Sequence, residues 1–347
     1  PEPDAHAVIL IRDSQPELHM FVQDRNEEME TWEGKRLGQS GAVDEYDASK
    51  AYSFQDYEKR LPNLLRGFND IYCDYSSNNF EKHDKKILTH AVPYDQRGAD
   101  FSNATLHSLQ PLVSELRLIK SEGEIELLTK ACDITVEGHI HAMKTTNTGM
   151  YEYQVGAEME EIFYDRGAER LGYPSRVAGG HNACILHYST NRDQLDDGNL
   201  LLIDAAAEYG MYSSDVTRTF PVSGKFTSPQ KDVYEEVLRV QNEGVEGVVV
   251  GNSMKEVHQQ TIKTLSESLV NLKLVPLGVE ETISMMHFFE FFMHGTGHWL
   301  GLDVHDAGSN EVNGKPESGH YPRVLAIDLN EGLLSIAEQL KIDGKRF

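Results

Sequence analysis

The sequence predicts an α+β chain of two domains: a smaller mixed α/β domain at residues 1–114 and a larger domain at residues 115–347. Short strand-like runs occur near the N-terminus, whereas long helical repeats begin only after about residue 115. Two apolar runs on either side of Gly210 predict an antiparallel hairpin in the second domain. A chain of 347 residues is long enough for this division.

The first domain is expected to begin with two strands, at residues 7–12 and 19–24, separated by the polar turn "DSQPE". Apolar side chains at helical spacing follow at residues 54–68. Because the first strand begins only a few residues into the sequence, we expect this domain to be incomplete here. The start of the chain has no basic region followed by an apolar segment, so we expect no signal peptide.

The second domain is expected to open with a helix that begins at a capping box of Ser121 and Glu124. Its apolar positions repeat at helical spacing, and they are Ile125, Leu128, Cys132, Val136 and Ile140. The other expected elements of this domain are a helix at 152–166 ended by Gly167, strands at 199–209 and 211–222, a helix at 228–249, and a helix at 254–270 with a capping box from Ser253 to Glu256.

The composition excludes several classes of partner. The formal net charge of −24 argues against nucleic acid and against an anionic membrane surface, because phosphate groups require a basic surface. No apolar run reaches the length of about 18 residues that crosses a bilayer. The three cysteines, Cys73, Cys132 and Cys184, are odd in number and scattered. This pattern is typical of a reducing compartment, and we expect a cytoplasmic protein.

Two carboxylates flank the predicted hairpin turn. Asp204 ends the apolar run "LLLID", and Asp215 lies in the next strand eleven residues later. An aspartate at the end of a buried strand requires a partner or a metal ion, and two such groups on adjacent strands can point to one spot. Spacing alone leaves a second interpretation open, in which Asp215 pairs with Arg218 and Asp204 closes a turn.

The segment "FFMHGTGHWLGLDVHD" at residues 291–306 contains His294, His298 and His305. Gly295 and Gly297 disfavour a helix, and the apolar residues that follow predict an extended, buried strand. His298 and His305 would then face opposite sides of that strand, so we do not expect all three histidines to bind a single metal. Each histidine taken singly can also be an ordinary core or turn residue.

Three ordered segments resemble the pita-bread metallopeptidase family, in its aminopeptidase P branch. They are "NACILHYSTN", "LLIDAAAEYGMYSSDVTRTFPVSGKFT" and "HGTGHWLGLDVHD". The similarity runs from residue 1 to about residue 308, and it includes "ETWEGKRLGQ" in the N-terminal domain and "LRLIKSEGEIELL" at the entry to the second. It implies a pita-bread catalytic domain, in which helices cover a curved antiparallel sheet.

The resemblance also implies a reaction: hydrolysis of the peptide bond between an N-terminal residue and a following proline, by a hydroxide that bridges two metal ions. Three of the family's five ligand positions correspond to Asp204 on one metal, Asp215 on both and His298 on the second. His187 and His305 resemble two histidines that hold the substrate and stabilise its carbonyl, and His294 resembles a supporting histidine. Such an oxygen-rich site suits Mn²⁺, with Zn²⁺ or Co²⁺ as alternatives.

The last part of the sequence departs from the family pattern, which ends with two strands that each carry a ligand glutamate. "NEGLLSIAEQ" places Glu338 at the first of these positions, and "LKID" makes Asp343 the candidate for the second. The same tail fits an amphipathic helix through its apolar residues, which are Leu329, Leu333, Ile336 and Leu340.

These observations leave three functions open: an Xaa-Pro aminopeptidase, an Xaa-Pro dipeptidase (prolidase), or a degenerate member that binds peptides without cleaving them. The expected partner in each case is a peptide with proline at its second position. We also expect a homo-oligomer, a dimer or a tetramer, because members of the family commonly are.

Overall fold

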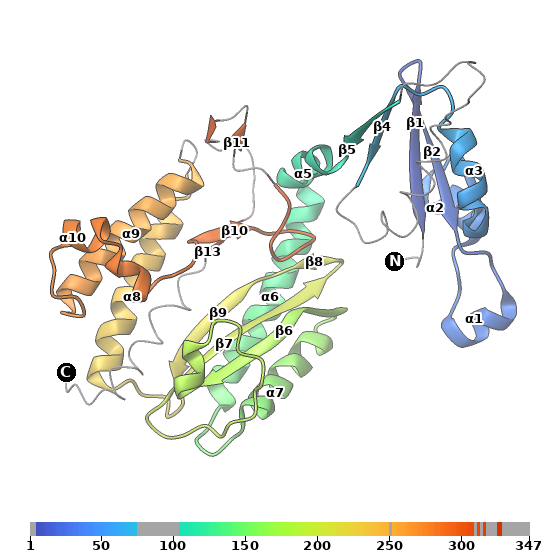
Figure 1. Cartoon of the computed structure of the whole chain (residues 1–347). Helices are drawn as coiled ribbons and strands as arrows, with labels where there is room; N and C mark the ends of the chain where they lie inside the picture. The colour runs from blue at the N-terminus through green and yellow to red at the C-terminus, as the bar shows by residue number, and fades with distance from the viewer. Residues whose placement is uncertain are drawn as a thin grey trace. The chain divides into compact units, whose positions relative to one another are not determined.

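The computed structural model describes residues 5–74, 104–249, 252–308, 311–312, 315–316 and 325–327. The chain divides into two compact units, Pro1–Pro111 and Leu112–Phe347, and each combines helices with β-strands (Figure 1). No helix among these described residues is long and apolar enough to span a membrane.

The first unit is built around a three-stranded sheet. β1 (His6–Arg12) and β2 (Gln15–Val22) are antiparallel, and β3 (Lys50–Ser53) pairs in parallel with β2. The remaining described elements are α1 (Glu27–Glu33), α2 (Gly38–Tyr46), η1 (Phe54–Asp56), α3 (Tyr57–Leu64) and the parallel pair β4 (Asp70–Cys73) and β5 (Thr105–Ser108). Phe21 of β2 packs against Tyr57 and Leu61 of α3 in the core.

The predicted turn between the first two strands was too long. Only Asp13 and Ser14 form it, with φ angles of 49° and 63°, and β2 already begins at Gln15. A two-residue turn with two positive φ angles matches the twist of a hairpin, so the strands continue up to it. Pro16 is accommodated because β3 pairs only with residues 19–22 and needs no backbone donor from Pro16.

The second unit contains the central hairpin. Its described elements are α5 (Gln110–Leu118, which includes the unit boundary), α6 (Glu122–Thr145), α7 (Glu152–Asp165), β6 (Arg170–Gly179), η3 (Gly180–Cys184), β7 (Leu200–Tyr209), β8 (Tyr212–Ser213), β9 (Val216–Pro221), α8 (Ser228–Glu246), α9 (Met254–Asn271), α10 (Val279–Ser284), η4 (His287–Glu290), β10 (Gly297–Trp299), β11 (Glu311–Val312), β12 (Lys315–Pro316) and β13 (Leu325–Ile327).

β7 is the central strand of its sheet, which agrees with its continuous apolar sequence. It pairs antiparallel with β6 on one side and with β8 and β9 on the other. Residues 200–207 are all buried. Helices α6 and α7 cover one face of this sheet (Figure 1). The two helices cross closely at Gly138, where a Cβ atom would lie 2.4 Å from Phe163.

The predicted helices are present, but the apolar stripe expected on the first of them is only partly its buried face, because Leu128 is buried and the C-terminal members of the stripe are not. Val136 and Ile140 are each 43% exposed, whereas Ala131, Gly138 and Ala142 are buried. Small side chains allow α6 to approach the sheet and α7 closely, so that large residues of the neighbouring elements fill the space.

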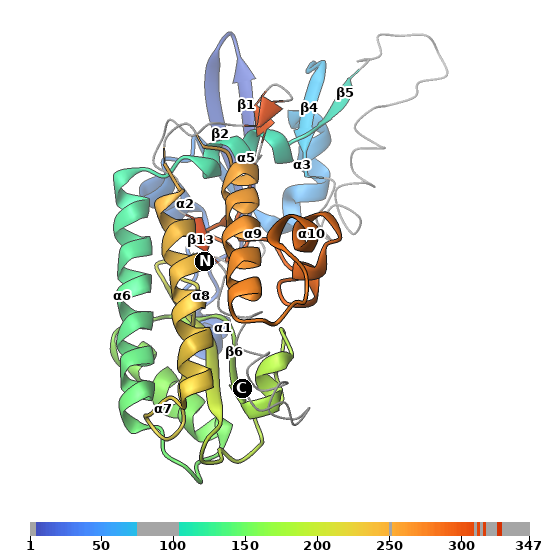
Figure 2. The same cartoon turned by 90° about the vertical axis from the view of Figure 1, so that its left-hand side faces the viewer.

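The capping boxes predicted at Ser121 and Ser253 are both confirmed. Helix α8 ends at Glu246, three residues before the predicted end. It packs against α9, and the two helices form an antiparallel pair. Figure 2 draws α8 next to α6, but this is an effect of the viewing direction and not a packing contact like that of α8 with α9.

Candidate active site

The two predicted carboxylates lie together at the hairpin. Asp204 is on β7 and only 2% exposed, and Asp215 lies in a short break between β8 and β9. The predicted strand 211–222 is therefore two strands, and Asp215 is outside both. The Tyr173 hydroxyl, from β6, donates to Asp215 Oδ1 at 2.6 Å and to Asp204 Oδ1 in a shorter contact.

Asp215 does not follow the alternative interpretation, in which it pairs with Arg218. The Arg218 guanidinium donates instead to the carbonyl of Thr217 at 2.8 Å. Asp215 Oδ2 lies 3.1 Å from His298 Nε2, so Asp215 links the Tyr173–Asp204 contact to His298. His294 is not part of this group, as described below.

A basic side chain also contacts this group. Arg176 Nη1 donates to Asp204 Oδ2, and Arg176 faces Asp204 across the β6–β7 pair. Burial raises the pKa of Asp204, and the nearby Asp215 carboxylate adds to this effect, while Tyr173 and Arg176 oppose it. Burial also raises the pKa of Tyr173, and its two carboxylate neighbours raise it further, so Tyr173 remains a hydrogen-bond donor.

The donor set suits a divalent cation. The two carboxylates together carry more negative charge than the one guanidinium in contact with Asp204 can neutralise. His298 Nδ1 contacts the Trp299 carbonyl at 2.9 Å, which leaves the Nε2 atom directed at Asp215 Oδ2. When Nδ1 carries the proton, two lone pairs face each other there, and a cation between them removes the repulsion. The chemistry of these residues therefore fits a metal ion.

The described residues do not complete a metal site by themselves. Within the described ranges, no three His, Cys, Asp or Glu side chains are grouped closely enough to hold a metal ion. Glu338 and Asp343, the candidates for the remaining ligands, lie outside the described residues.

His298 and His305 lie side by side, which contradicts the prediction that they face opposite sides of a strand. Only residues 297–299 are extended, and the chain then turns back, so that Asp306 N donates to the Trp299 carbonyl at 2.9 Å. Consequently, the imidazole rings of His298 and His305 have centroids 4.1 Å apart. The strand-parity argument was wrong because it assumed that the glycine-flanked segment continues straight.

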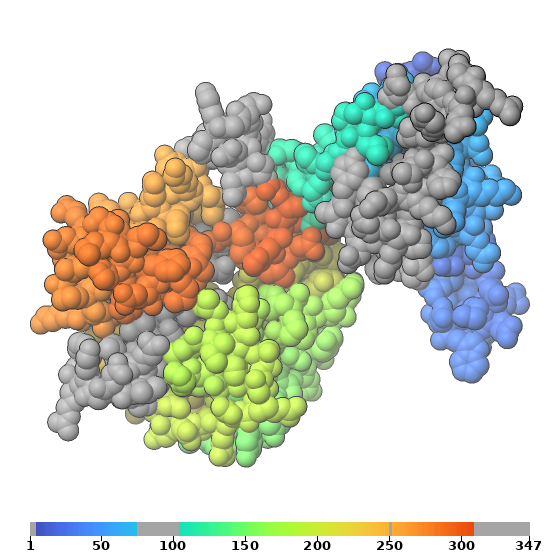
Figure 3. Space-filling view, viewed as in Figure 1, coloured from blue at the N-terminus to red at the C-terminus, as the bar shows by residue number. Residues whose placement is uncertain are grey.

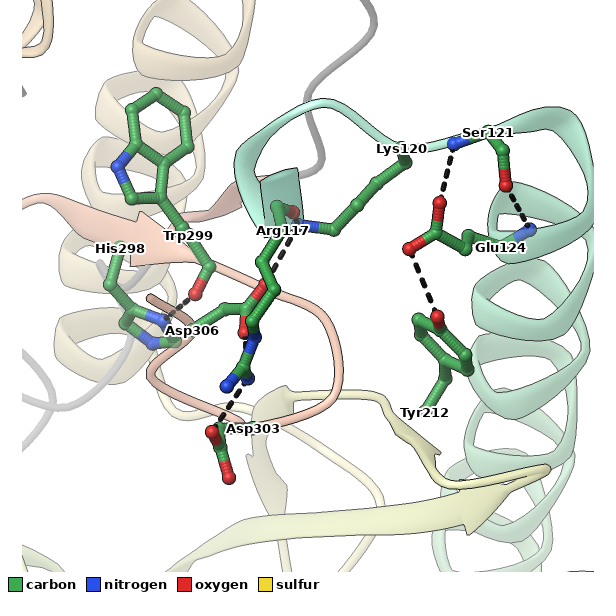
Figure 4. A network of polar contacts seen from close by, with 9 residues as sticks. All are labelled: Arg117, Lys120, Ser121, Glu124, Tyr212, His298, Trp299, Asp303 and Asp306. Carbon is green, nitrogen blue, oxygen red and sulfur yellow. Dashed lines mark hydrogen bonds and ion pairs between the residues drawn. The ribbon is translucent and has the colours of Figure 1, made fainter. Parts of the chain in front are cut away.

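Two basic residues, Arg117 in the last turn of α5 and Lys120 just before α6, hold the turn that carries His305 (Figure 4). Lys120 Nζ lies 2.7 Å from Asp306 Oδ2, and both side chains are 1% exposed. Arg117 contacts Asp306 Oδ1 and also Asp303 Oδ2 at 2.6 Å. We call these four residues the Asp306 clamp. In Figure 3 the orange-red segment that contains β10 lies against the blue-green start of this unit. The clamp ties Asp306, the neighbour of His305, to the end of α5 and to the connection between α5 and α6.

His187 lies in an exposed turn after η3. The loop around it is organised by Glu152, the fully buried first residue of α7. Glu152 accepts four hydrogen bonds, all of 2.7–3.0 Å, from Gly179 N, Asn182 Nδ2, the Tyr188 hydroxyl and Asp193 N. We call these five residues the Glu152 network. Among the described residues, no hydrogen bond joins His187 to Asp204 or Asp215.

His294 lies apart from the carboxylates. Its ring packs edge-on against Phe292, with centroids 4.5 Å apart, and its Nδ1 contacts the Gly295 carbonyl at 2.8 Å. Its Nε2 is buried and has no hydrogen-bond partner among the described residues.

Sequence reasoning missed several residues of this site. Tyr173 and Arg176 belong to a strand that had no distinctive spacing, and Lys120 was noticed only as part of a helix entry. Lys120 and Asp306 each lie among other charged residues, and their pairing over 186 positions is not readable from one sequence.

Family profiles match both parts of the chain. The profile described as metallopeptidase family M24 matches residues 126–327, and the profile described as aminopeptidase P, N-terminal domain, matches residues 1–72. Among curated proteins, the Xaa-Pro aminopeptidase of Haemophilus influenzae is 39% identical over 309 residues, which cover 89% of this chain and 69% of that protein. The Xaa-Pro aminopeptidase of Escherichia coli is 36% identical over 337 residues, with coverages of 96% and 75%.

Solved structures agree with the sequence comparison. The aminopeptidase PepP of Pseudomonas aeruginosa has a TM-score of 0.89 and 35% identity, and the match covers 94% of this chain and 74% of that one. An Escherichia coli aminopeptidase P variant in complex with substrate has a TM-score of 0.87 at 35% identity, with the same coverages. These matches confirm the predicted α+β fold of the pita-bread type. The chain belongs to metallopeptidase family M24 and, within it, to the aminopeptidase P group of metallo-exopeptidases.

Proposed function

We propose that this chain is a dinuclear-metal aminopeptidase that hydrolyses the bond between an N-terminal residue and a following proline. The observation that carries the proposal is that Asp204 and Asp215 both contact the Tyr173 hydroxyl, while Asp215 Oδ2 lies 3.1 Å from His298 Nε2. Two of the relatives above are named Xaa-Pro aminopeptidase, and solved relatives include complexes with a substrate and with the inhibitor Pro-Leu.

In this proposal Asp204, Asp215 and His298 hold divalent ions, most suitably Mn²⁺, with Zn²⁺ or Co²⁺ as alternatives. Glu338 and Asp343 are the candidates for the other two ligand positions. Divalent ions bound there would supply a nucleophilic hydroxide near neutral pH and would polarise the substrate carbonyl.

The chain's own residues orient the peptide. His305, beside His298, and His187, on its exposed turn, donate hydrogen bonds to the carbonyl oxygen as it gains negative charge. His294 supports this segment through its packing on Phe292. Tyr173 holds the two carboxylates at a fixed separation. A proline in the second position lacks an N–H group and fixes its own φ angle, so it needs a pocket that accepts a kinked peptide.

We further propose that residues 1–114 form an N-terminal domain of the aminopeptidase P type and residues 115–347 the catalytic domain. The protein is proposed to be cytoplasmic and to assemble as a dimer or tetramer.

One observation favours a second candidate function, that of a peptide-binding member without catalysis. Arg176 already engages Asp204, which is one of the proposed metal ligands. A weakly bound metal would leave the peptide intact.

The test is to incubate the Mn²⁺-loaded protein with Ala-Pro-Ala and, separately, with Ala-Pro, and to follow the products by mass spectrometry. We expect alanine to be released from the tripeptide and not from the dipeptide, with about two metal ions per chain. The variant Asp215→Asn is the inactive control. Cleavage of the dipeptide alone would indicate a dipeptidase, and an intact tripeptide on fully metal-loaded protein would indicate a non-catalytic binder.

A further inference from the structure

Strand β6 presents two arginines to carboxylates of β7. Arg170 faces Glu208, with Nε 2.7 Å from Oε1, and Arg176 faces Asp204. In both pairs the arginine lies directly across the strand pair from its carboxylate, but the surroundings of the two pairs differ. The Arg170 side chain is 50% exposed, whereas the Arg176 side chain is 22% exposed and its partner Asp204 is 4% exposed.

Both oxygens of Asp204 already have donors from the chain. Oδ1 accepts from the Tyr173 hydroxyl, and Oδ2 accepts from Arg176. The guanidinium also lies over the Tyr173 ring, 5.0 Å from its centroid, so its position is fixed from a second side. Asp204 is thus a buried carboxylate whose charge is neutralised by a side chain rather than by water.

A guanidinium and a divalent ion compete for the same carboxylate oxygen. They repel each other at short range, and an oxygen that already accepts a charge-assisted hydrogen bond is a weaker ligand. The opposite effect is also known in principle, because a donor that orients a ligand strengthens metal binding by about 10–100-fold. Removing Arg176 should raise the affinity for the divalent ion if Arg176 competes with it, and should lower that affinity if Arg176 orients the ligand.

We propose that Arg176 is a built-in competitor of the metal: it occupies Asp204 Oδ2 in the metal-free protein and has to leave that oxygen when a divalent ion binds. Arg176 thereby lowers the affinity of the Asp204 side of the site and keeps the buried Asp204 carboxylate neutralised without metal. The proposal deepens the proposed function and rests on it, since it assumes that Asp204 is a metal ligand.

The test measures Mn²⁺ affinity without any peptide, by isothermal titration of the demetallated full chain. Arg176→Met removes the competing charge, and Arg176→Gln removes the charge but keeps a hydrogen-bond donor for Asp204, which protects folding. Arg170→Met is the matched control on the same strand pair. We expect both Arg176 variants to bind Mn²⁺ roughly tenfold more tightly than wild type, or better. The reason is that wild type must break the charge-assisted hydrogen bond between Arg176 and Asp204 when Mn²⁺ binds, whereas the variants have no such bond to break. The Arg170 variant should bind like wild type.

Weaker or unchanged Mn²⁺ binding by both Arg176 variants would overturn the proposal and leave the proposed function standing. An equal gain in the Arg170→Met variant would also overturn it, because the effect would then come from net charge alone. Absence of Mn²⁺ binding in the wild type and in all variants would overturn the proposed function and this proposal together. Circular dichroism of each variant confirms that it is folded.

Discussion

The loops that carry His187 and His305 are both anchored on a buried carboxylate, but by different means. The Glu152 network surrounds its carboxylate with neutral donors, two of them backbone N–H groups. The Asp306 clamp surrounds its carboxylate with two cations, Lys120 and Arg117. Both carboxylates are nearly inaccessible to water.

The comparison shows that a buried negative charge is stabilised in two different ways. Glu152 is the first residue of α7, where the helix dipole and converging N–H groups favour a negative charge. Asp306 lies in an irregular turn without such a dipole and is neutralised by ion pairs that also reach Asp303. The first arrangement depends on backbone geometry, whereas the second depends on replaceable side chains.

The largest expected effect is that of Asp306→Ala. It leaves the buried Lys120 ammonium without its carboxylate, which destabilises a fold by about 3–5 kcal/mol when one partner of a buried pair is lost. Asp303→Ala is the matched control, because Asp303 is 67% exposed and its pair with Arg117 contributes at most about 1 kcal/mol. Urea unfolding measures both. Equal losses for the two variants would contradict the special role of the buried pair.

Glu152→Gln is expected to cost about 2–3 kcal/mol, because an amide nitrogen replaces one acceptor oxygen and leaves buried donors unsatisfied. Urea unfolding of Glu158→Gln, on the same helix, provides the control, since Glu158 is 42% exposed and lies 4.0 Å from its partner His141. A difference smaller than about 0.5 kcal/mol between these variants would show that the network adds no more than a surface contact does.

A double variant sharpens the contrast between the two anchors. In Lys120→Met/Asp306→Leu the buried ion pair is replaced by apolar side chains, a change that is often neutral in free energy. We expect it to recover about 2 kcal/mol of the loss seen in Asp306→Ala. Glu152→Leu should show no comparable recovery in the same measurement, because the N–H groups of Gly179 and Asp193 cannot be replaced by apolar groups. Similar unfolding free energies for the double variant and Glu152→Leu would remove the distinction.

The smallest effect is a pH dependence beside the clamp, at Glu124. Burial opposes the shift, but hydrogen bonds from the Ser121 backbone and hydroxyl and from Tyr212 lower the pKa of Glu124 below its ordinary value of 4.5. A lowered pKa in the folded state stabilises the fold above pH 4.5, and this contribution is lost as the pH falls through the folded value. Thermal unfolding of wild type and Glu124→Gln between pH 6 and 3 should therefore converge in acid. Parallel curves would contradict this account.

Local patterns in the sequence predicted much of the fold. The capping boxes at Ser121 and Ser253 and the apolar run of β7 depend on neighbouring residues, and each appears where it was expected. The errors lie where long-range packing decides: the buried face of α6 includes small residues that lie outside the predicted apolar stripe, and the strand after Gly297 turns back at residue 300.

The candidate site shows the same division. The hairpin placed Asp204 and Asp215 together, because the two flank a predicted turn. The roles of Tyr173, Arg176 and the Asp306 clamp were not predicted. They depend on contacts between residues that are 28 to 189 positions apart, and sequence periodicity does not encode such contacts. The tail with Glu338 lies outside the described residues, so its predicted role stays a prediction.

The most direct test of the central claim is an anomalous-scattering map of crystals grown with Mn²⁺. The account predicts two peaks, with Asp215 contacting both, Asp204 contacting one and His298 the other. A map in which no peak lies within bonding distance of these three side chains, from crystals of Mn²⁺-saturated protein, would contradict it.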